Sequence, residues 1–65
     1  MPIVRVELFP GRSPEKKLEI AREITRTLGK VAGIKPADAT VIFSEVSPAD
    51  WIVAGEALGR APAGA

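Results

Sequence analysis

The sequence contains neither cysteine nor histidine among its 65 residues. Without cysteine there is no disulfide, no thiolate metal ligand and no cysteine nucleophile. Without histidine the usual zinc sites and the commonest general base are missing, and a serine hydroxyl has no imidazole to activate it. We therefore expect no metal centre and no bound cofactor, so that any chemistry comes from carboxylates, lysine, arginine, hydroxyl groups or the chain terminus.

Aromatic residues and a charge excess are also lacking. Three aromatics, Phe9, Phe43 and Trp51, offer little for stacking nucleic-acid bases, and nine basic residues against eight acidic ones give no bias toward nucleic acid. No apolar run approaches the ~20 residues of a membrane span, and the amino terminus does not resemble a secretory signal. We expect a cytoplasmic protein that binds neither nucleic acid nor membrane.

The chain is short enough to form at most one domain, residues 1–65. A chain of this size buries only about 60% of the surface that its unfolded form exposes, and usually needs a disulfide, a metal or an oligomer for stability. Because cysteine and histidine are absent, oligomerisation is the remaining route.

The apolar pattern predicts a β-α-β subunit of the α+β class. Residues 3–9 alternate as a strand does, and so do residues 39–46. Between them Ser13 caps a helix that has Pro14 at its first position and ends at Gly33. Its apolar stripe comprises Leu18, Ala21, Ile24, Leu28 and Val31. The two strands should be parallel.

The remaining segments are less regular. Gly29 inside the predicted helix costs about 1 kcal/mol relative to alanine, and nothing in the sequence explains it. Residues 47–50 predict a turn, residues 51–53 a short extended segment, and residues 59–65 a flexible or partner-covered tail.

Both faces of the predicted sheet carry apolar side chains, although one helix can cover only one face. Ile3 and Phe9 of the first strand share one face with Ile42 and Val46 of the second strand. The remaining apolar residues of both strands lie on the opposite face. A two-stranded sheet with a bare apolar face is not stable alone, so we expect symmetric association.

Pro2 is the strongest candidate base. Removal of Met1 would expose a secondary amine, and α-amino groups titrate near pH 8, lower when desolvated. Such an amine can accept a proton from a carbon next to a carbonyl group. Taken alone, a second-position proline is more often incidental, or merely protects a strand edge. If Met1 is retained, the Pro2 nitrogen is an amide and has no basic lone pair.

Arg12 is the candidate anion-binding residue. It lies in the Gly11-Arg12-Ser13 turn, directly before the predicted helix, where the helix end favours anions. A guanidinium group there can bind a carboxylate through two hydrogen bonds. The alternative is a solvated turn residue paired with Glu15.

Together these features resemble the 4-oxalocrotonate tautomerase family, whose short members begin with a catalytic proline and carry a Gly-Arg-Ser turn about ten residues later. The resemblance covers roughly residues 2–58. It continues through Glu15-Lys16-Lys17, the helix, the strand at residues 41–45, and Trp51 with Gly55-Glu56.

The resemblance implies dimers of β-α-β subunits, three of which form a hexamer, either from identical chains or with a paralogous chain. It implies an isomerase in which Pro2 transfers a proton within a 2-hydroxydienoate or related enol to give the 2-keto form. Arg12 would bind a substrate carboxylate, often from a neighbouring subunit, and Trp51 would form part of an apolar wall.

One position departs from the family pattern. The best characterised members of the family carry a second arginine at the start of the second strand, where this chain has Thr40, or Ala39 if the register slips by one. Three interpretations follow: the substrate differs, Arg60 or Lys35 substitutes for the arginine, or a partner chain supplies it. The last possibility leaves a second interpretation open, that of a non-catalytic structural or binding subunit in a heterohexamer.

The superfamily branches that act by hydration use an acidic residue just after the wall aromatic. This chain has Ile52 and Val53 there, and Asp50 precedes Trp51. Hydrolytic chemistry is therefore not expected.

Overall fold

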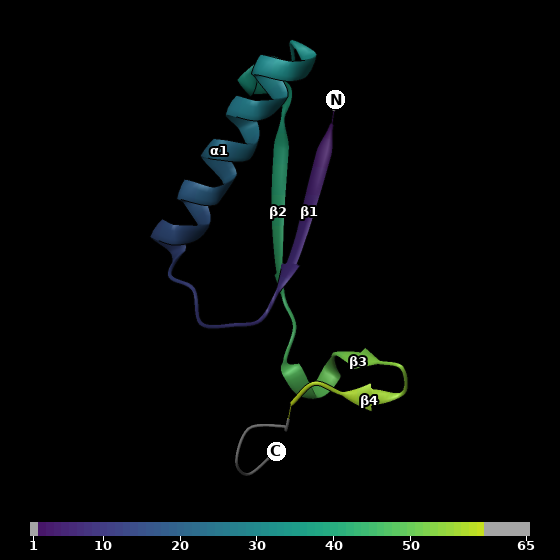
Figure 1. Cartoon of the computed structure of the whole chain (residues 1–65). Coiled ribbons are helices and arrows are strands. Elements are labelled where there is room, and N and C mark those ends of the chain that lie inside the picture. The colour runs from purple at the N-terminus through teal and green to yellow at the C-terminus, as the bar shows by residue number, and fades with distance from the viewer. Residues whose placement is uncertain (1, 60–65) are drawn as a thin grey trace.

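The computed structural model describes residues 2–59 as a β-α-β unit followed by a small hairpin (Figure 1). Strand β1 (Ile3–Leu8) is followed by helix α1 (Pro14–Ala32), a 3-10 turn (Pro36–Asp38) and strand β2 (Thr40–Glu45). A second 3-10 turn (Pro48–Asp50) leads to strands β3 (Ile52–Val53) and β4 (Glu56–Ala57). The predicted β-α-β order is confirmed. Apart from Gly59, the predicted tail lies outside the described residues.

The two long strands are parallel, as expected, and pair from Ile3 with Thr40 to Leu8 with Glu45. Exposure alternates along β1: the even-numbered residues are half-buried and the odd-numbered residues are exposed. Helix α1 lies beside β2, with β1 on the far side from the helix (Figure 1). Because the helix covers one face, Ile3, Arg5 and Glu7 are left on the open face of the sheet.

Helix α1 begins where the sequence predicts. The Ser13 hydroxyl accepts a hydrogen bond from the backbone N–H of Lys16 at 3.2 Å, and Pro14 occupies the first helical position. Pro14 has no N–H to leave unpaired, so both residues favour the start of the helix at this point.

The carboxyl end of α1 explains the glycine inside the helix. Gly33 adopts a left-handed conformation (φ 68°), and its N–H donates to the Gly29 carbonyl at 3.0 Å. The bond from Gly33 is that of an αL cap. The N–H of Ile34 also donates to a helix carbonyl, that of Leu28, at 3.3 Å. A Cβ atom at position 29 would lie only 3.3 Å from the Ile34 carbonyl oxygen. Glycine at position 29 therefore leaves room for the chain to fold back.

The helix face toward the sheet is narrower than the predicted stripe. Ala21, Ile24 and Leu28 are half-buried, but the side chains of Leu18 and Val31 are 50% and 79% exposed. At the start of the helix Lys17 forms an ion pair of 2.7 Å with Glu45 at the end of β2. That ion pair joins the first turns of α1 to β2 in a region where the helix buries little apolar surface.

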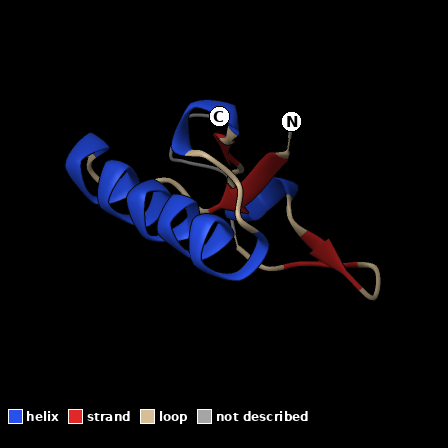
Figure 2. Ribbon diagram, turned by 90° about the horizontal axis from the view of Figure 1, so that it is seen from above, coloured by secondary structure: helices blue, strands red, loops and turns tan. Residues whose placement is uncertain are grey.

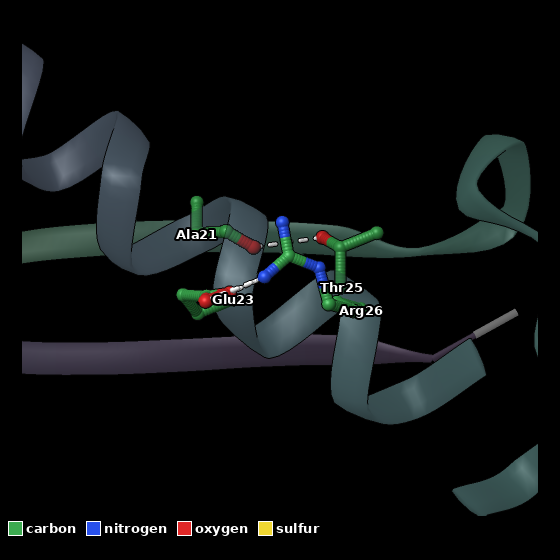
Figure 3. A network of polar contacts seen from close by, with 4 residues as sticks. All are labelled: Ala21, Glu23, Thr25 and Arg26. Atoms are coloured by element: carbon green, nitrogen blue, oxygen red, sulfur yellow. Dashed lines mark hydrogen bonds and ion pairs between the residues drawn. The ribbon is translucent and has the colours of Figure 1, made fainter. Parts of the chain in front are cut away.

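Two polar side chains of α1 have their partners within the same helix (Figure 3). The Thr25 hydroxyl donates to the Ala21 carbonyl at 2.8 Å, and Arg26 forms an ion pair with Glu23 one turn earlier. Within the described residues no helix combines the length and apolar composition that crossing a membrane requires.

The hairpin formed by β3 and β4 closes through a two-residue turn at Ala54 and Gly55. Both have positive φ angles, 54° and 81°, as a type I′ turn requires, and Val53 pairs with Glu56 across it. A backbone hydrogen bond from the N–H of Leu58 to the Trp51 carbonyl (2.9 Å) anchors the returning strand. The sequence predicted the first arm of this hairpin but not β4.

The described chain has no interior of its own, since none of residues 2–59 is fully buried. The radius of gyration is 15.2 Å, against about 11 Å for a compact domain of this length. The hairpin projects beyond the end of the sheet, away from the helix (Figures 1 and 2). Several apolar side chains are at least half exposed: Ile3, Leu18, Val31, Ile52, Val53 and Leu58. Such a surface is what a subunit of an assembly exposes when viewed alone.

Candidate active site

Pro2 lies at the amino end of β1, beside the start of β2. It is half-buried, and its carbonyl oxygen accepts a hydrogen bond from the N–H of Thr40 at 3.1 Å. The ring restricts the φ angle of Pro2, and the bond to β2 holds its carbonyl group. The nitrogen of Pro2 is therefore attached to a rigid part of the sheet, which suits a group that must meet a substrate in one geometry.

The predicted wall residue, Trp51, packs against a residue that sequence reasoning did not assign to the site. Its ring lies edge-on to that of Phe9, with the centroids 4.7 Å apart and the planes at 66°. Phe9 directly follows β1, and Trp51 directly follows the second 3-10 turn, so two distant segments meet here. Alternation along β1 marked Phe9 as an apolar residue, but nothing in the sequence indicated its partner.

Arg12 lies in the exposed loop between β1 and α1, immediately before the helix cap Ser13. Among residues 2–59 it takes part in no ion pair, so the considered pairing with Glu15 is not formed. The guanidinium group is therefore available to an anion close to the amino end of a helix, where backbone N–H groups add to the attraction.

Pro2 and the other two predicted site residues lie at opposite ends of the sheet. β1 has six residues, and at about 3.3 Å per residue roughly 20 Å separates its ends. Pro2 precedes the strand, whereas Arg12 lies in the loop that follows its carboxyl end and leads to α1, and Trp51 lies directly before β3. A single chain thus brings Trp51 together with Phe9 but does not bring either Trp51 or Arg12 to Pro2.

The position of the missing second arginine is next to Pro2. Thr40 is the first residue of β2, is exposed, and is the backbone partner described above. Lys35, one suggested substitute, is exposed and precedes the 3-10 turn before β2. The other suggested substitute, Arg60, lies outside the described residues.

Another hollow in the described chain does not coincide with the predicted site. A depression of about 650 Å³ runs along α1 to Pro36, and none of the three predicted site residues lines it. Arg22, Arg26 and Lys30 border it, and Arg26 is already paired with Glu23. Nor do residues 2–59 bring three or more acidic side chains together where they could hold a metal ion.

Comparison with known proteins identifies the family. The family model described as "Tautomerase enzyme" matches residues 2–61. A probable tautomerase of Ralstonia nicotianae is 42% identical over 62 residues, which is 95% of this chain and 95% of that protein.

Solved structures give the same assignment. TomN, a 4-oxalocrotonate tautomerase homologue of the tomaymycin biosynthetic pathway, superposes with a TM-score of 0.81 at 30% identity, over 88% of each chain. A heterohexamer 4-oxalocrotonate tautomerase of Chloroflexus aurantiacus superposes with a TM-score of 0.79 at 31% identity, over 89% of this chain and 94% of that one. With this fold, and with a family match over nearly its whole length, the chain belongs to the tautomerase family.

Proposed function

We propose that this chain is a cytoplasmic 4-oxalocrotonate tautomerase-like isomerase that interconverts the enol and keto forms of a small 2-hydroxydienoate or related 2-keto acid. One observation carries the proposal: in a member of the tautomerase family, proline follows the first methionine and directly precedes the first strand. Removal of Met1 converts that proline into a secondary amine on a rigid support.

In this proposal Pro2 acts first as a base and then as an acid. The neutral amine accepts the proton of the substrate's enol hydroxyl group, and the resulting ammonium group returns a proton to a carbon of the conjugated chain. An O–H bond breaks and a C–H bond forms, the substrate becomes the 2-keto acid, and Pro2 ends neutral as it began. No cofactor or second reactant is consumed.

Arg12 and the aromatic pair supply binding and environment. The Arg12 guanidinium group binds a substrate carboxylate through paired hydrogen bonds. Trp51, together with Phe9, forms an apolar wall that excludes water and disfavours the charged form of the Pro2 amine, which keeps the amine ready to accept a proton. Because roughly 20 Å separates the two ends of β1, these groups must come from two different chains.

The test compares the trimmed protein with a Pro2→Ala variant on phenylenolpyruvate and on 2-hydroxymuconate. Intact mass spectrometry first establishes that Met1 is absent from both proteins. Its removal is expected in both, because proline and alanine are both small second residues. We expect the variant to lose at least about 100-fold in kcat/KM, the contribution typical of a positioned base. Equal rates, with circular dichroism and native mass unchanged, would refute the proposal.

The second candidate function is a non-catalytic structural or binding subunit of a heterohexamer. It is favoured by the uncharged Thr40 beside Pro2, and it has a precedent in the heterohexameric relative from Chloroflexus aurantiacus. It predicts no activity for the chain alone, retention of Met1, and stable co-assembly with a paralogous chain. Intact and native mass spectrometry of the purified complex distinguish the two candidates in one experiment.

A further inference from the structure

After leaving the hairpin, the chain crosses over the second 3-10 turn at Gly59. The N–H of Gly59 donates to the Pro48 carbonyl at 3.2 Å, and the N–H of the preceding residue, Leu58, donates to the Trp51 carbonyl. Residues 52–58 are exposed, whereas Gly59 is half-buried. The hairpin therefore returns to the turn from which it started and packs against it.

This crossing leaves no room for a side chain at position 59. A Cβ atom there would overlap the Cβ atom of Pro48 and would lie 3.5 Å from its Cγ atom and 3.6 Å from its Cα atom. The Cβ atom of Pro48 belongs to a closed ring and cannot rotate away. Gly59 does not have the positive φ angle of Gly11, Gly33 and Gly55. Glycine is therefore required at position 59 by the close approach to Pro48 and not by the backbone conformation.

Pro48 is itself fixed in place. It is the first residue of the second 3-10 turn, and the Ser47 hydroxyl caps this turn by accepting a hydrogen bond from the N–H of Ala49 at 3.3 Å. The Pro48 carbonyl accepts two hydrogen bonds, one from Gly59 and one from the N–H of Trp51 at 3.3 Å. A single carbonyl group thus joins the end of the hairpin to the predicted wall residue.

Trp51 is held at three points as a result. Its N–H bonds to Pro48, its carbonyl group accepts from Leu58, and its ring lies edge-on to Phe9. The first two contacts fix the backbone from which the ring projects, and both depend on the hairpin lying close to the turn. Displacing the hairpin from the turn therefore leaves the ring with the contact to Phe9 alone.

We propose that Gly59 is a positioning residue: by closing over Pro48 without a side chain, it fixes Trp51 against Phe9 and so sets the apolar wall of the candidate site. A larger residue at position 59 pushes the hairpin away from the turn, because the rigid ring of Pro48 cannot move aside. The hydrogen bonds from Leu58 and Gly59 are then lost, and the ring of Trp51 turns toward water. The consequence for catalysis rests on the proposed function, whereas the effect on Trp51 does not.

The first test follows the fluorescence of Trp51, the only tryptophan of the chain, in the Gly59→Ala variant of the full-length protein. We expect the emission to move to longer wavelength than in the wild type. Quenching by iodide should rise at least about twofold, because the half-buried ring becomes accessible through local opening. Emission and quenching equal to those of the wild type would overturn the proposal.

Two double variants provide a matched control. Pro48→Gly removes the Cβ atom that a side chain at position 59 would meet, whereas Pro48→Ala removes the ring but keeps that atom. We therefore expect Pro48→Gly/Gly59→Ala to regain the emission of Pro48→Gly alone, and Pro48→Ala/Gly59→Ala to remain shifted relative to Pro48→Ala. Equal behaviour of the two double variants would contradict the proposed contact. If Gly59→Ala fails to fold, as judged by circular dichroism and native mass, this comparison gives the same test.

The pH dependence of kcat/KM tests the consequence for catalysis. The Pro2 amine acts as a base when neutral, so kcat/KM rises with pH through the pKa of the amine in the free enzyme. Because the wall disfavours the charged amine, displacing Trp51 should raise this pKa and move the rise to higher pH. We expect Gly59→Ala to lose at least about tenfold in kcat/KM below the rise and to recover part of that loss above it. An equal loss at every pH would show that Gly59 does not act through the wall.

The failure of this inference and the failure of the proposed function give different results. If the trimmed wild type and Pro2→Ala have equal rates, the proposed function is wrong, and the emission of Trp51 still decides whether Gly59 positions the ring. If Pro2→Ala is inactive but Gly59→Ala matches the wild type in emission and in rate, the proposed function stands and the role of Gly59 is refuted.

Discussion

The contact between Phe9 and Trp51 is predicted to be a main attachment of the hairpin to the rest of the chain. Trp51→Ala removes an edge-to-face contact worth about 0.5–1.5 kcal/mol. It also removes roughly 100 Å² of buried apolar surface, since the side chain is half-buried, which corresponds to about 2.5 kcal/mol. The expected loss in free energy of unfolding is therefore about 3–4 kcal/mol, within the range typical of tryptophan-to-alanine changes. Phe9→Leu, which keeps an apolar side chain, should cost about 1 kcal/mol.

Urea unfolding followed by far-ultraviolet circular dichroism measures these losses. All variants are compared at one protomer concentration, because the stability of an assembling chain depends on concentration. Trp51 is the only tryptophan, so its emission in Phe9→Leu reports the change in its own surroundings. A double-mutant cycle with Trp51→Leu should give a coupling free energy of about 0.5–1.5 kcal/mol. Additive effects, with coupling below about 0.3 kcal/mol, would show that the two rings do not stabilise each other.

Four further changes test other parts of the molecule. Arg12→Lys should lose nearly as much kcat/KM as Arg12→Ala, at least about 30-fold, because an ammonium group cannot form the bidentate pair; wild-type activity in the lysine variant would contradict this. Thr40→Arg should raise kcat/KM on 2-hydroxymuconate about tenfold or more by stabilising developing negative charge, and an unchanged rate would indicate that another cation already does so. Ala54→Asn should increase the free energy of unfolding by about 0.5–1 kcal/mol, since asparagine tolerates positive φ better, and a decrease in urea midpoint would argue against the turn. Gly29→Ala should fail to gain the usual ~1 kcal/mol of helix propensity because its Cβ approaches the Ile34 carbonyl, so a full gain would contradict the close approach.

Most of the β-α-β unit could be predicted because its signals are local. Ser13, Pro14 and Gly33 act within one helical turn of their own positions, and alternation along residues 3–8 reports which side of the strand is covered. The width of the helix face could not be predicted. Leu18 and Val31 have the right spacing, but burial depends on how far the short sheet extends beneath the helix.

The second arm of the hairpin, β4, has no comparable local signal in its sequence. Glutamate and alanine, the two residues of β4, are both poor strand formers. Ala54-Gly55 differs from the Asn-Gly and Asp-Gly pairs that usually indicate a two-residue turn. The turn forms because Val53 and Glu56 pair across it and Leu58 bonds back to Trp51, contacts that depend on the folded chain.

The candidate site could also be predicted only in part. The chemistry of Pro2 and of Arg12 can be recognised from each residue and its immediate neighbours. The distance between them is a property of β1. We propose that a second chain bridges this distance, and no periodicity within one sequence describes such a contact. Phe9 was missed as a member of the site because its contact with Trp51 joins segments that are distant in sequence.

The lack of any fully buried residue among residues 2–59 has a consequence for the life of the protein in the cell. If the chain assembles as we propose, a newly synthesised chain acquires a buried core only when it meets a partner, so we expect its survival to depend on that encounter preceding cleavage by a protease. Because that encounter is bimolecular, the amount of assembled protein should rise more steeply than the rate of synthesis at low expression. Mutations that weaken contacts between chains would then appear mainly as reduced abundance, even where every catalytic group is intact.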